Sequence, residues 1–253
     1  MNDKKVERNR YDGRALKLLS KGSFDKDTGS SSYSLPIRTP YLRYEEMHIE
    51  FIDNNDNVLE IGAGTGIHTH SLLETGAFVV ATDISPNSVQ IIKKKYKKYS
   101  DKLIAKVADM EHLPFGNETF DVVCSAGSLS YGDNQIVMNE IYRVLKKGGV
   151  MIAVDSLNNN PVYRLNRYMH YLKGNRSKST LIRMPTISLI DKYTENFGYA
   201  EVKFFGAITW TFPLLSKILS EQAVIKLSNW IDIKFNIRES AFKFVIMLEK
   251  NET

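Results

Sequence analysis

The sequence is poor in cysteine and has no long apolar run. It contains one cysteine, Cys124, so neither a disulfide nor a cysteine-based zinc site can form within the chain. No apolar stretch approaches the roughly 20 residues that cross a bilayer. The opening residues, MNDKKVERNR, are too polar for a signal peptide. We therefore expect a soluble, cytoplasmic protein without a transmembrane segment and without a bound metal.

The chain also lacks a strong excess of one charge. It has 34 lysines and arginines against 29 aspartates and glutamates, so its formal net charge is +5. This balance is a mild bias toward anionic partners, and it is too small to predict nucleic-acid binding. Apolar residues make up 43% of the chain, which is typical of a globular protein that buries its own core.

Apolar runs and helical stretches alternate through most of the chain. The sequence predicts strands at 58–61, 78–82, 103–107, 120–125, 150–154, 201–210 and 241–248. It predicts helices at 14–19, 41–52, 67–73, from Ser85-Pro86 onward, at 134–145 and at 213–230. Strands that alternate with helices form a mostly parallel sheet, so we expect an α/β fold with seven strands and helices on both faces.

Two segments do not follow this alternation. Residues 1–40 are polar, with a glycine- and serine-rich stretch at 21–34 that predicts a mobile loop and with Pro36 and Pro40 before the next helix. We expect residues 1–40 to form an N-terminal lid over a domain of residues 41–253. Residues 156–198 separate the fifth and sixth strands and predict an insertion that caps the substrate.

A glycine-rich motif follows the first predicted strand. The sequence VLEIGAGTG at 58–66 places a buried strand before a tight turn and a helix. Glycine lets the backbone turn sharply and approach a ligand closely, and the helix beyond offers unpaired N–H groups. The NAD fingerprint would need glycine at position 67, where this chain has Ile67. The motif therefore predicts a nucleotide site, and it disfavours an NAD-dependent oxidoreductase.

An acidic residue, Asp83, ends the second predicted strand. It stands about 20 residues beyond the first glycine, the spacing at which a carboxylate can receive both ribose hydroxyls. The alternative is that Asp83 only caps the helix that begins at Ser85. We expect Asp83 to bind a ribose.

Five motifs in this order resemble the class I S-adenosylmethionine-dependent methyltransferases, in the small-molecule branch that includes quinone-biosynthesis enzymes. They are VLEIGAGTG, VVATDIS, VADMEHLPF, FDVVCSAGS and LKKGGVMIAVDS, and the match covers about residues 41–156. The resemblance implies a Rossmann-like fold with S-adenosylmethionine as cofactor. It implies that Asp83 holds the ribose, that Asp109 meets the adenine amino group and that Met110 flanks the ring. The remaining cofactor residues that we expect are Tyr11, Glu60, Gly62, Ala63, Gly64, Gly66, Ile84 and Ser125.

The catalytic residues are less clearly marked than the cofactor residues. Alignment of the reactants is worth about 7–11 kcal/mol in well-oriented systems, and a general base adds roughly 10²–10⁴-fold. Tyr131 follows the fourth strand, and His170 lies in the insertion, so both are candidates to face the substrate; each could instead be structural. The sequence SAGS at 125–128 replaces the [D/N]-P-P-[Y/F] loop of enzymes that methylate base amines, which argues against that chemistry.

The insertion is basic. No acidic residue lies between Asp155 and Asp191, and a helix is expected between Asn160 and Gly174. On one side of that helix we expect a substrate-binding set formed by Arg164, Arg167, Tyr168 and Tyr171. Arginine suits bidentate recognition of phosphate or carboxylate, so the set predicts an anionic, sugar-like acceptor. A solvated basic face and an RNA contact are the alternatives.

The leading interpretation is an O-methyltransferase of a sugar or of a nucleotide- or phosphate-linked sugar. The insertion also resembles methyltransferases of bacterial surface-glycan pathways, which implies a role in glycan biosynthesis. The alternatives are carbon methylation of a prenylated quinone precursor, RNA methylation, and a cofactor-binding regulator that has lost activity. A homodimer is an open expectation.

Overall fold

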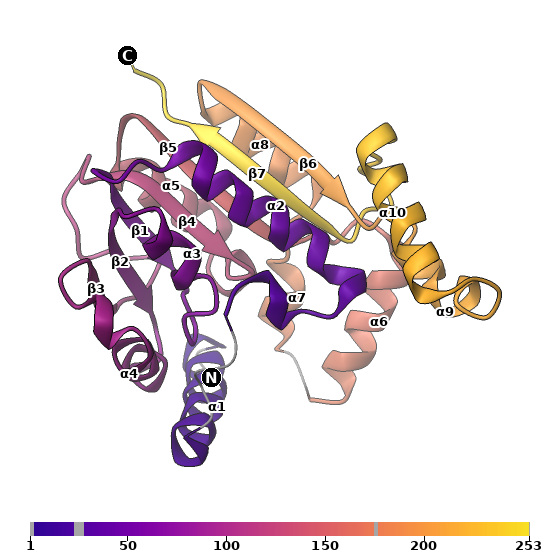
Figure 1. Ribbon diagram of the computed structural model, residues 1–253, viewed down its shortest axis with the longest axis horizontal. Helices are drawn as coiled ribbons and strands as arrows, with labels where there is room; N and C mark the ends of the chain where they lie inside the picture. The colour runs from indigo at the N-terminus through magenta and orange to yellow at the C-terminus, as the bar shows by residue number, and fades with distance from the viewer. Residues whose placement is uncertain (1–2, 23–27, 175–176, 253) are drawn as a thin grey trace.

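The computed structural model describes residues 3–22, 28–174 and 177–252. The chain folds around a seven-stranded sheet with the order β3-β2-β1-β4-β5-β7-β6 (Figure 1). The strands are β1 (Asn57–Ile61), β2 (Phe78–Asp83), β3 (Leu103–Val107), β4 (Phe120–Ala126), β5 (Leu145–Ser156), β6 (Tyr199–Phe205) and β7 (Lys243–Glu249). Strands β1 to β5 pair in parallel, whereas β7 runs antiparallel to both β5 and β6. The expected fold class is therefore confirmed.

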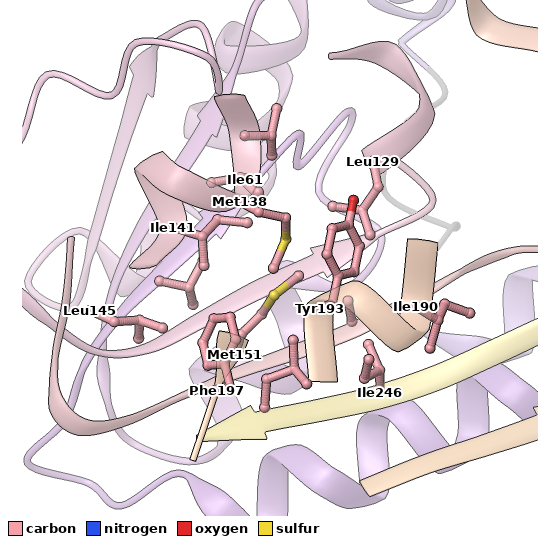
Figure 2. Packing of buried hydrophobic residues seen from close by; sticks show 14 of the residues in the cluster. Ile61, Leu129, Met138, Ile141, Leu145, Met151, Ile190, Tyr193, Phe197 and Ile246 are labelled. Atoms are coloured by element: carbon pink, nitrogen blue, oxygen red, sulfur yellow. The ribbon is translucent and has the colours of Figure 1, made fainter. Parts of the chain in front are cut away.

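Helices cover both faces of the sheet because its strands are apolar on both sides. Alternate residues of one strand point to opposite faces, so Leu59 packs into one core and Val58 into the other. The first core lies under α5 (Asn134–Val144) and α8 (Ile187–Asn196), where Met151 and Phe197 meet Ile141 (Figure 2). The second lies under α2 (Leu35–Phe51), α3 (Thr69–Glu74) and α4 (Pro86–Lys95). Cys124 is a fully buried member of this second core.

The N-terminal region is more ordered than the sequence predicted. Helix α1 spans Asp3–Lys21 rather than 14–19 only, and α2 begins at Leu35 rather than 41. Pro36 occupies the first turn of α2, and Pro40 lies inside the helix, so Pro40 does not precede it as expected. Part of the expected loop, residues 23–27, is outside the described residues. The part that follows forms a short 3-10 helix, η1 (Ser30–Ser32), instead of a mobile loop.

The described part of the insertion after β5 contains three helices: α6 (Pro161–Leu172), α7 (Lys178–Ile182) and α8. The expected strand at 201–210 ends at Phe205, because the chain turns at Gly206 into η4 (Thr209–Thr211). The expected helix at 213–230 is divided into α9 (Phe212–Leu215) and α10 (Glu221–Phe235). Two further 3-10 turns are η2 (Lys97–Tyr99) and η3 (Leu129–Tyr131). Among the described helices, none has the length and apolar character to cross a membrane.

Candidate active site

A cavity of about 340 Å³ lies at the carboxyl ends of β1, β2, β3 and β4. This is the edge of a parallel sheet where ligands of doubly wound folds bind. Nine of the eleven expected cofactor residues line it: Tyr11, Glu60, Gly62, Ala63, Gly64, Asp83, Ile84, Asp109 and Met110. Helix α1 supplies further lining residues, so the cavity lies between the strand ends and the N-terminal helix.

The glycine turn shapes the floor of this cavity. Gly62 has a φ of +61°, and a β-carbon there would lie 2.7 Å from the Ser128 hydroxyl and closer still to Ser128 Cβ. Gly64 has a φ of +56° and no atom within 4 Å of a built β-carbon, so its backbone faces open space in the cavity. Gly66 is outside the lining: a β-carbon there would meet the Tyr96 ring at 2.9 Å, so this glycine serves packing against α4.

Asp83 holds the glycine turn in place. Its Oδ2 accepts a hydrogen bond from the Gly64 amide at 2.9 Å, and its Oδ1 accepts one from the Ser85 amide at 2.8 Å. Burial raises the pKa of the carboxyl above its ordinary value, although the two amides oppose this effect. Each carboxylate oxygen keeps a further lone pair, so Asp83 can still accept hydrogen bonds from a ligand in the cavity.

Glu60 is a second acid at the cavity, and it is more deeply buried. Its Oε2 accepts a hydrogen bond from the Thr69 hydroxyl at 2.5 Å. Burial raises its pKa from 4.5 to about 8, so the carboxyl holds a proton at neutral pH. A cation in the cavity would lower this pKa, and Glu60 therefore suits a ligand that carries positive charge.

An ion pair joins α1 to the end of β3, which sequence reasoning did not predict. Lys4 Nζ lies 2.7 Å from Asp109 Oδ2 and 2.5 Å from Glu111 Oε2. Burial would raise the pKa of Asp109, but the hydrogen bonds from Lys4 and the Glu111 amide together with the charge of Lys4 outweigh it, so the pKa lies below its ordinary value. Asp109 is thus a charged acceptor at the cavity edge where the resemblance places the adenine amino group.

Two further contacts fasten α1 across the cavity. The Tyr11 hydroxyl hydrogen-bonds to the Tyr131 hydroxyl, and the two rings meet edge to face with centroids 5.2 Å apart. Asp12 accepts hydrogen bonds from the Ser85 hydroxyl at 2.7 Å and from the Asn87 amide at 3.1 Å, so it adds a second cap to α4. Tyr131 lines the cavity, as does Tyr11.

A hydrogen-bonded chain of three side chains forms another wall of the cavity, and the sequence did not predict it. Glu45 Oε1 lies 3.1 Å from His68 Nδ1, and His68 Nε2 lies 3.2 Å from the Tyr33 hydroxyl. Tyr33 stacks on Tyr41 with ring centroids 3.7 Å apart. Burial raises the pKa of Glu45, but hydrogen bonds from His68 and Ser30 outweigh it and leave the pKa below its ordinary value. Tyr33 and His68 both line the cavity.

The other expected site residues lie away from the cavity. Ser125 is buried beneath it, where its hydroxyl lies 2.7 Å from the Ser128 hydroxyl. Helix α6 carries His170, Arg164, Tyr168 and Tyr171, none of which lines the cavity. Arg167 turns into the protein instead of toward a ligand: it is 4% exposed and donates to the Leu157 carbonyl at 2.7 Å. The expected contact of Arg167 with a substrate therefore disagrees with its position.

The cavity fits S-adenosylmethionine on the geometry of its own residues. The glycine turn leaves room for a ligand against the backbone, Asp83 and Asp109 offer carboxylates, and Met110 and Ile84 offer apolar contact. Glu60 adds a carboxyl that a cationic tail would favour. Sheet order and site together define a class I methyltransferase fold, in which bound S-adenosylmethionine supplies a methyl group.

Comparison with known proteins agrees with this fold. Residues 59–153 match the family described as "Methyltransferase domain". The matched stretch, which is less than half of the chain, is thus similar to a methyltransferase domain, and its cofactor is S-adenosylmethionine.

Three similar proteins illustrate the range of this resemblance. Sterol 4-C-methyltransferase strm-1 of Caenorhabditis elegans is 35% identical over 123 residues, which are 47% of this chain and 36% of the relative. Erythromycin 3''-O-methyltransferase of Saccharopolyspora erythraea is 36% identical over 109 residues, which are 41% of this chain and 36% of the relative. The crystal structure of geranyl diphosphate C-methyltransferase from Streptomyces coelicolor A3(2) superposes with a TM-score of 0.60 at 14% identity, over 85% of this chain and 79% of that one. The match thus spans little more than a third of each of these two curated relatives.

Proposed function

We propose that the whole protein is an O-methyltransferase that uses S-adenosylmethionine to methylate a polar small molecule, in particular a sugar or a phosphate-linked sugar. The observation that carries this proposal is the chain of hydrogen bonds from Glu45 through His68 to Tyr33 at the cavity wall. A hydroxyl acceptor must lose a proton as it takes up the methyl group, and the hydrogen-bonded series Tyr33–His68–Glu45 can receive that proton.

The order of donors and acceptors in the chain follows from its geometry. With Glu45 accepting from His68 Nδ1–H, His68 Nε2 is left to accept from the Tyr33 hydroxyl. The Tyr33 oxygen then presents a lone pair for the hydroxyl of an acceptor. As the new O–CH₃ bond forms, the acceptor proton moves to Tyr33, and the Tyr33 proton moves to His68 Nε2. The resulting imidazolium is stabilised by the Glu45 carboxylate.

An anionic acceptor is supported by the arginines that do reach the cavity. Arg8 and Arg14 of α1 both line it and are exposed. They take over the role that the sequence assigned to Arg164 and Arg167. We propose that α1, within residues 1–40, acts as a lid, and that Tyr131 orients the acceptor beneath it. A cap formed by residues 156–198, a homodimer and a cytoplasmic location stay predictions.

The relatives support methyl transfer in general and leave the acceptor open. The erythromycin enzyme is named for O-methylation, and the sterol enzyme for carbon methylation. Carbon methylation of a prenylated quinone precursor is therefore not better supported than O-methylation. RNA methylation gains no support from the cavity, because the basic residues of α6 do not line it.

Cofactor binding can be tested first and the choice of acceptor second. Calorimetric titration with S-adenosylmethionine, S-adenosylhomocysteine and NADH should show binding of the first two only. Turnover with a panel of nucleotide sugars and prenylated quinone precursors, read by mass spectrometry and NMR, should give an O-methyl product. A carbon-methylated product, or binding of NADH alone, would contradict the proposal.

The proton relay is tested by replacing its members and measuring kcat of the variants. Tyr33→Phe and His68→Gln should each lower kcat by about a hundredfold or more while the affinity for S-adenosylhomocysteine stays within about twofold. His70→Gln is the matched control, because His70 lies in the first turn of α3, two residues after His68, is half-exposed and does not line the cavity. Unchanged kcat in Tyr33→Phe would remove the relay from the mechanism.

A further inference from the structure

Helix α6 turns its apolar side toward solvent, the reverse of an ordinary surface helix. Arg167 and Tyr163 point inward, where Arg167 packs over the Tyr163 and Phe242 rings. The outward side carries a stripe of apolar residues that are 46% to 66% exposed: Val162, Leu165, Tyr168, Met169 and Leu172. Their spacing over three turns puts them on one face of the helix. The buried side of α6 is therefore taken by Arg167 and Tyr163, and the apolar stripe faces outward.

Helix α10 presents a second exposed apolar face. Leu227, Trp230 and Ile233 share one side of the helix, and Ile233 is 82% exposed. The preceding segment adds Leu214 and Ile218, which are 64% and 79% exposed. The opposite side of α10 is tied to the protein, since Asp232 accepts hydrogen bonds from the Gly206 and Ala207 amides. The exposed face is thus presented by a fixed helix.

The two faces belong to one end of the molecule. Figure 1 shows α6, α9 and α10 gathered at the end of the sheet opposite β3 and α4. The Tyr163 hydroxyl of α6 donates to the Gly206 carbonyl at 3.3 Å, directly before η4 and α9. We call this surface, made of the outward residues of α6, α9 and α10, the apolar end.

The exposed charges around the apolar end are mostly positive. Its exposed cations are Arg164, Lys173, Lys217, Lys226 and Lys234, and none of them forms an ion pair within the described parts of the chain. On α10, Lys226 and Lys234 flank Trp230 and Ile233 on the same side. The sequence from 156 to 190 contains no acid, and between 206 and 238 the one exposed acid is Glu221.

We propose that the apolar end docks in the plane of an anionic lipid bilayer. Leucine, isoleucine and tryptophan side chains beside lysines are what an interfacial helix needs: the apolar groups enter the acyl boundary and the cations meet lipid phosphates. Charge complementarity favours an anionic partner, because the exposed cations would be left unpaired against a neutral or basic surface, and the exposed leucine, isoleucine and tryptophan side chains favour lipid. This docking is independent of the acceptor and goes beyond the proposed methyl transfer.

The chain carries its own reporter for this contact. It has two tryptophans, Trp210 and Trp230, which are 44% and 56% exposed and both lie in the segment that precedes or forms α10. Full-length protein is mixed with vesicles of phosphatidylcholine alone or with phosphatidylglycerol added, and binding is read by flotation and by tryptophan emission. We expect binding and a blue shift with the anionic vesicles, and weaker binding with neutral vesicles or at high salt.

Paired variants separate the apolar and electrostatic contributions. Leu172→Gln and Ile233→Gln should each weaken vesicle binding by about tenfold, and Lys226→Gln with Lys234→Gln should weaken binding to anionic vesicles by roughly tenfold or more. Ile49→Gln on α2, where the residue is 81% exposed, and Lys94→Gln on α4 are controls that should leave binding unchanged. All these residues are exposed, so the variants should fold, which circular dichroism verifies.

Three results would overturn the proposal. The first is an absence of binding to anionic vesicles. The second is binding that the Ile233→Gln and Leu172→Gln variants do not weaken. The third is a lipid-free dimer in sedimentation equilibrium that the same variants dissociate, since the apolar end would then be covered by a second copy of the chain.

Discussion

Replacing Gly62 by alanine tests the contact between the glycine turn and the loop after β4 that together form the cavity floor. The φ of Gly62 is +61°, and an alanine β-carbon would lie 2.7 Å from the Ser128 hydroxyl oxygen. The Ser128 hydroxyl is itself held by the Ser125 hydroxyl at 2.7 Å and donates to the Ile61 carbonyl at 3.2 Å, so it cannot turn away without losing both contacts. The variant is therefore strained in its backbone and crowded in its packing.

These two effects have separable magnitudes. A left-handed backbone costs a non-glycine residue about 1–2 kcal/mol, and an extra group in a packed site costs about 1–3 kcal/mol. We expect Gly62→Ala to lower the free energy of unfolding by about 2–5 kcal/mol. Gly64→Ala is the matched control, because the φ of Gly64 is +56° and the β-carbon of an alanine at this position would have no atom within 4 Å. It should lose only about 1–2 kcal/mol.

A double-mutant cycle with Ser128→Gly isolates the packing contribution. Ser128→Gly removes the two atoms that crowd an alanine at position 62, so the double variant should be about 1–3 kcal/mol more stable than additivity predicts. Urea denaturation followed by circular dichroism measures all four proteins without ligand. Additive costs, or a Gly62→Ala variant no less stable than Gly64→Ala, would refute the close approach of the two loops.

Three further predictions concern other parts of the structure. The raised pKa of Glu60, about 8, means that the folded protein keeps a proton that the unfolded chain loses above pH 4.5, so the contribution of Glu60 to stability should fall as the pH rises between these values, by at most about 1.4 kcal/mol per pH unit. Glu60→Gln should flatten this dependence of the free energy of unfolding on pH, measured by urea denaturation. An unchanged dependence in the variant would contradict this prediction. Asp12→Ala removes the hydrogen bonds from Ser85 and Asn87 and should lower the free energy of unfolding by about 1–2 kcal/mol. Proteases should then cleave α1 faster, and equal rates of proteolysis would show that Asp12 does not hold α1 in place. Glu118 has a φ of +52°, so its backbone is strained for a residue with a side chain. Glu118→Gly should relieve about 0.5–1 kcal/mol of this strain and so raise the midpoint temperature of thermal unfolding. A lowered midpoint temperature would show that the Glu118 side chain stabilises the protein by more than the strain costs.

The parts of the site that could be predicted are local in sequence. The turn at Gly62–Gly66 follows directly from a buried strand and precedes a helix, and Asp83 ends the neighbouring strand. In a parallel sheet, consecutive strands bring their carboxyl ends to one edge, so residues just after β1, β2 and β3 had to meet. This is why Glu60, Gly64, Asp83 and Asp109 line one cavity as the pattern suggested.

The parts that could not be predicted depend on distant partners. Lys4 meets Asp109 across 105 positions and Asp12 meets Ser85 across 73, and neither pair leaves a periodic signal in a polar N-terminal segment. Arg167 was expected on a ligand-binding face, but its side chain is buried among backbone carbonyls and rings that belong to other segments. Periodicity shows which residues share a side of a helix, and it does not show which side meets the protein.

The sequence by itself determined the α/β architecture and the residues that meet at the strand ends around the cavity, because strand hydrophobicity, glycine and strand-end acids act within a few positions of one another. Only the tertiary structure decided where α1 lies at the cavity, which side of α6 faces solvent, and that Tyr33, Glu45 and His68 are joined by hydrogen bonds. The reason is physical: hydrogen bonds and ion pairs of this kind have ranges of about 3 Å, and only the packed sheet and helices bring such distant side chains that close.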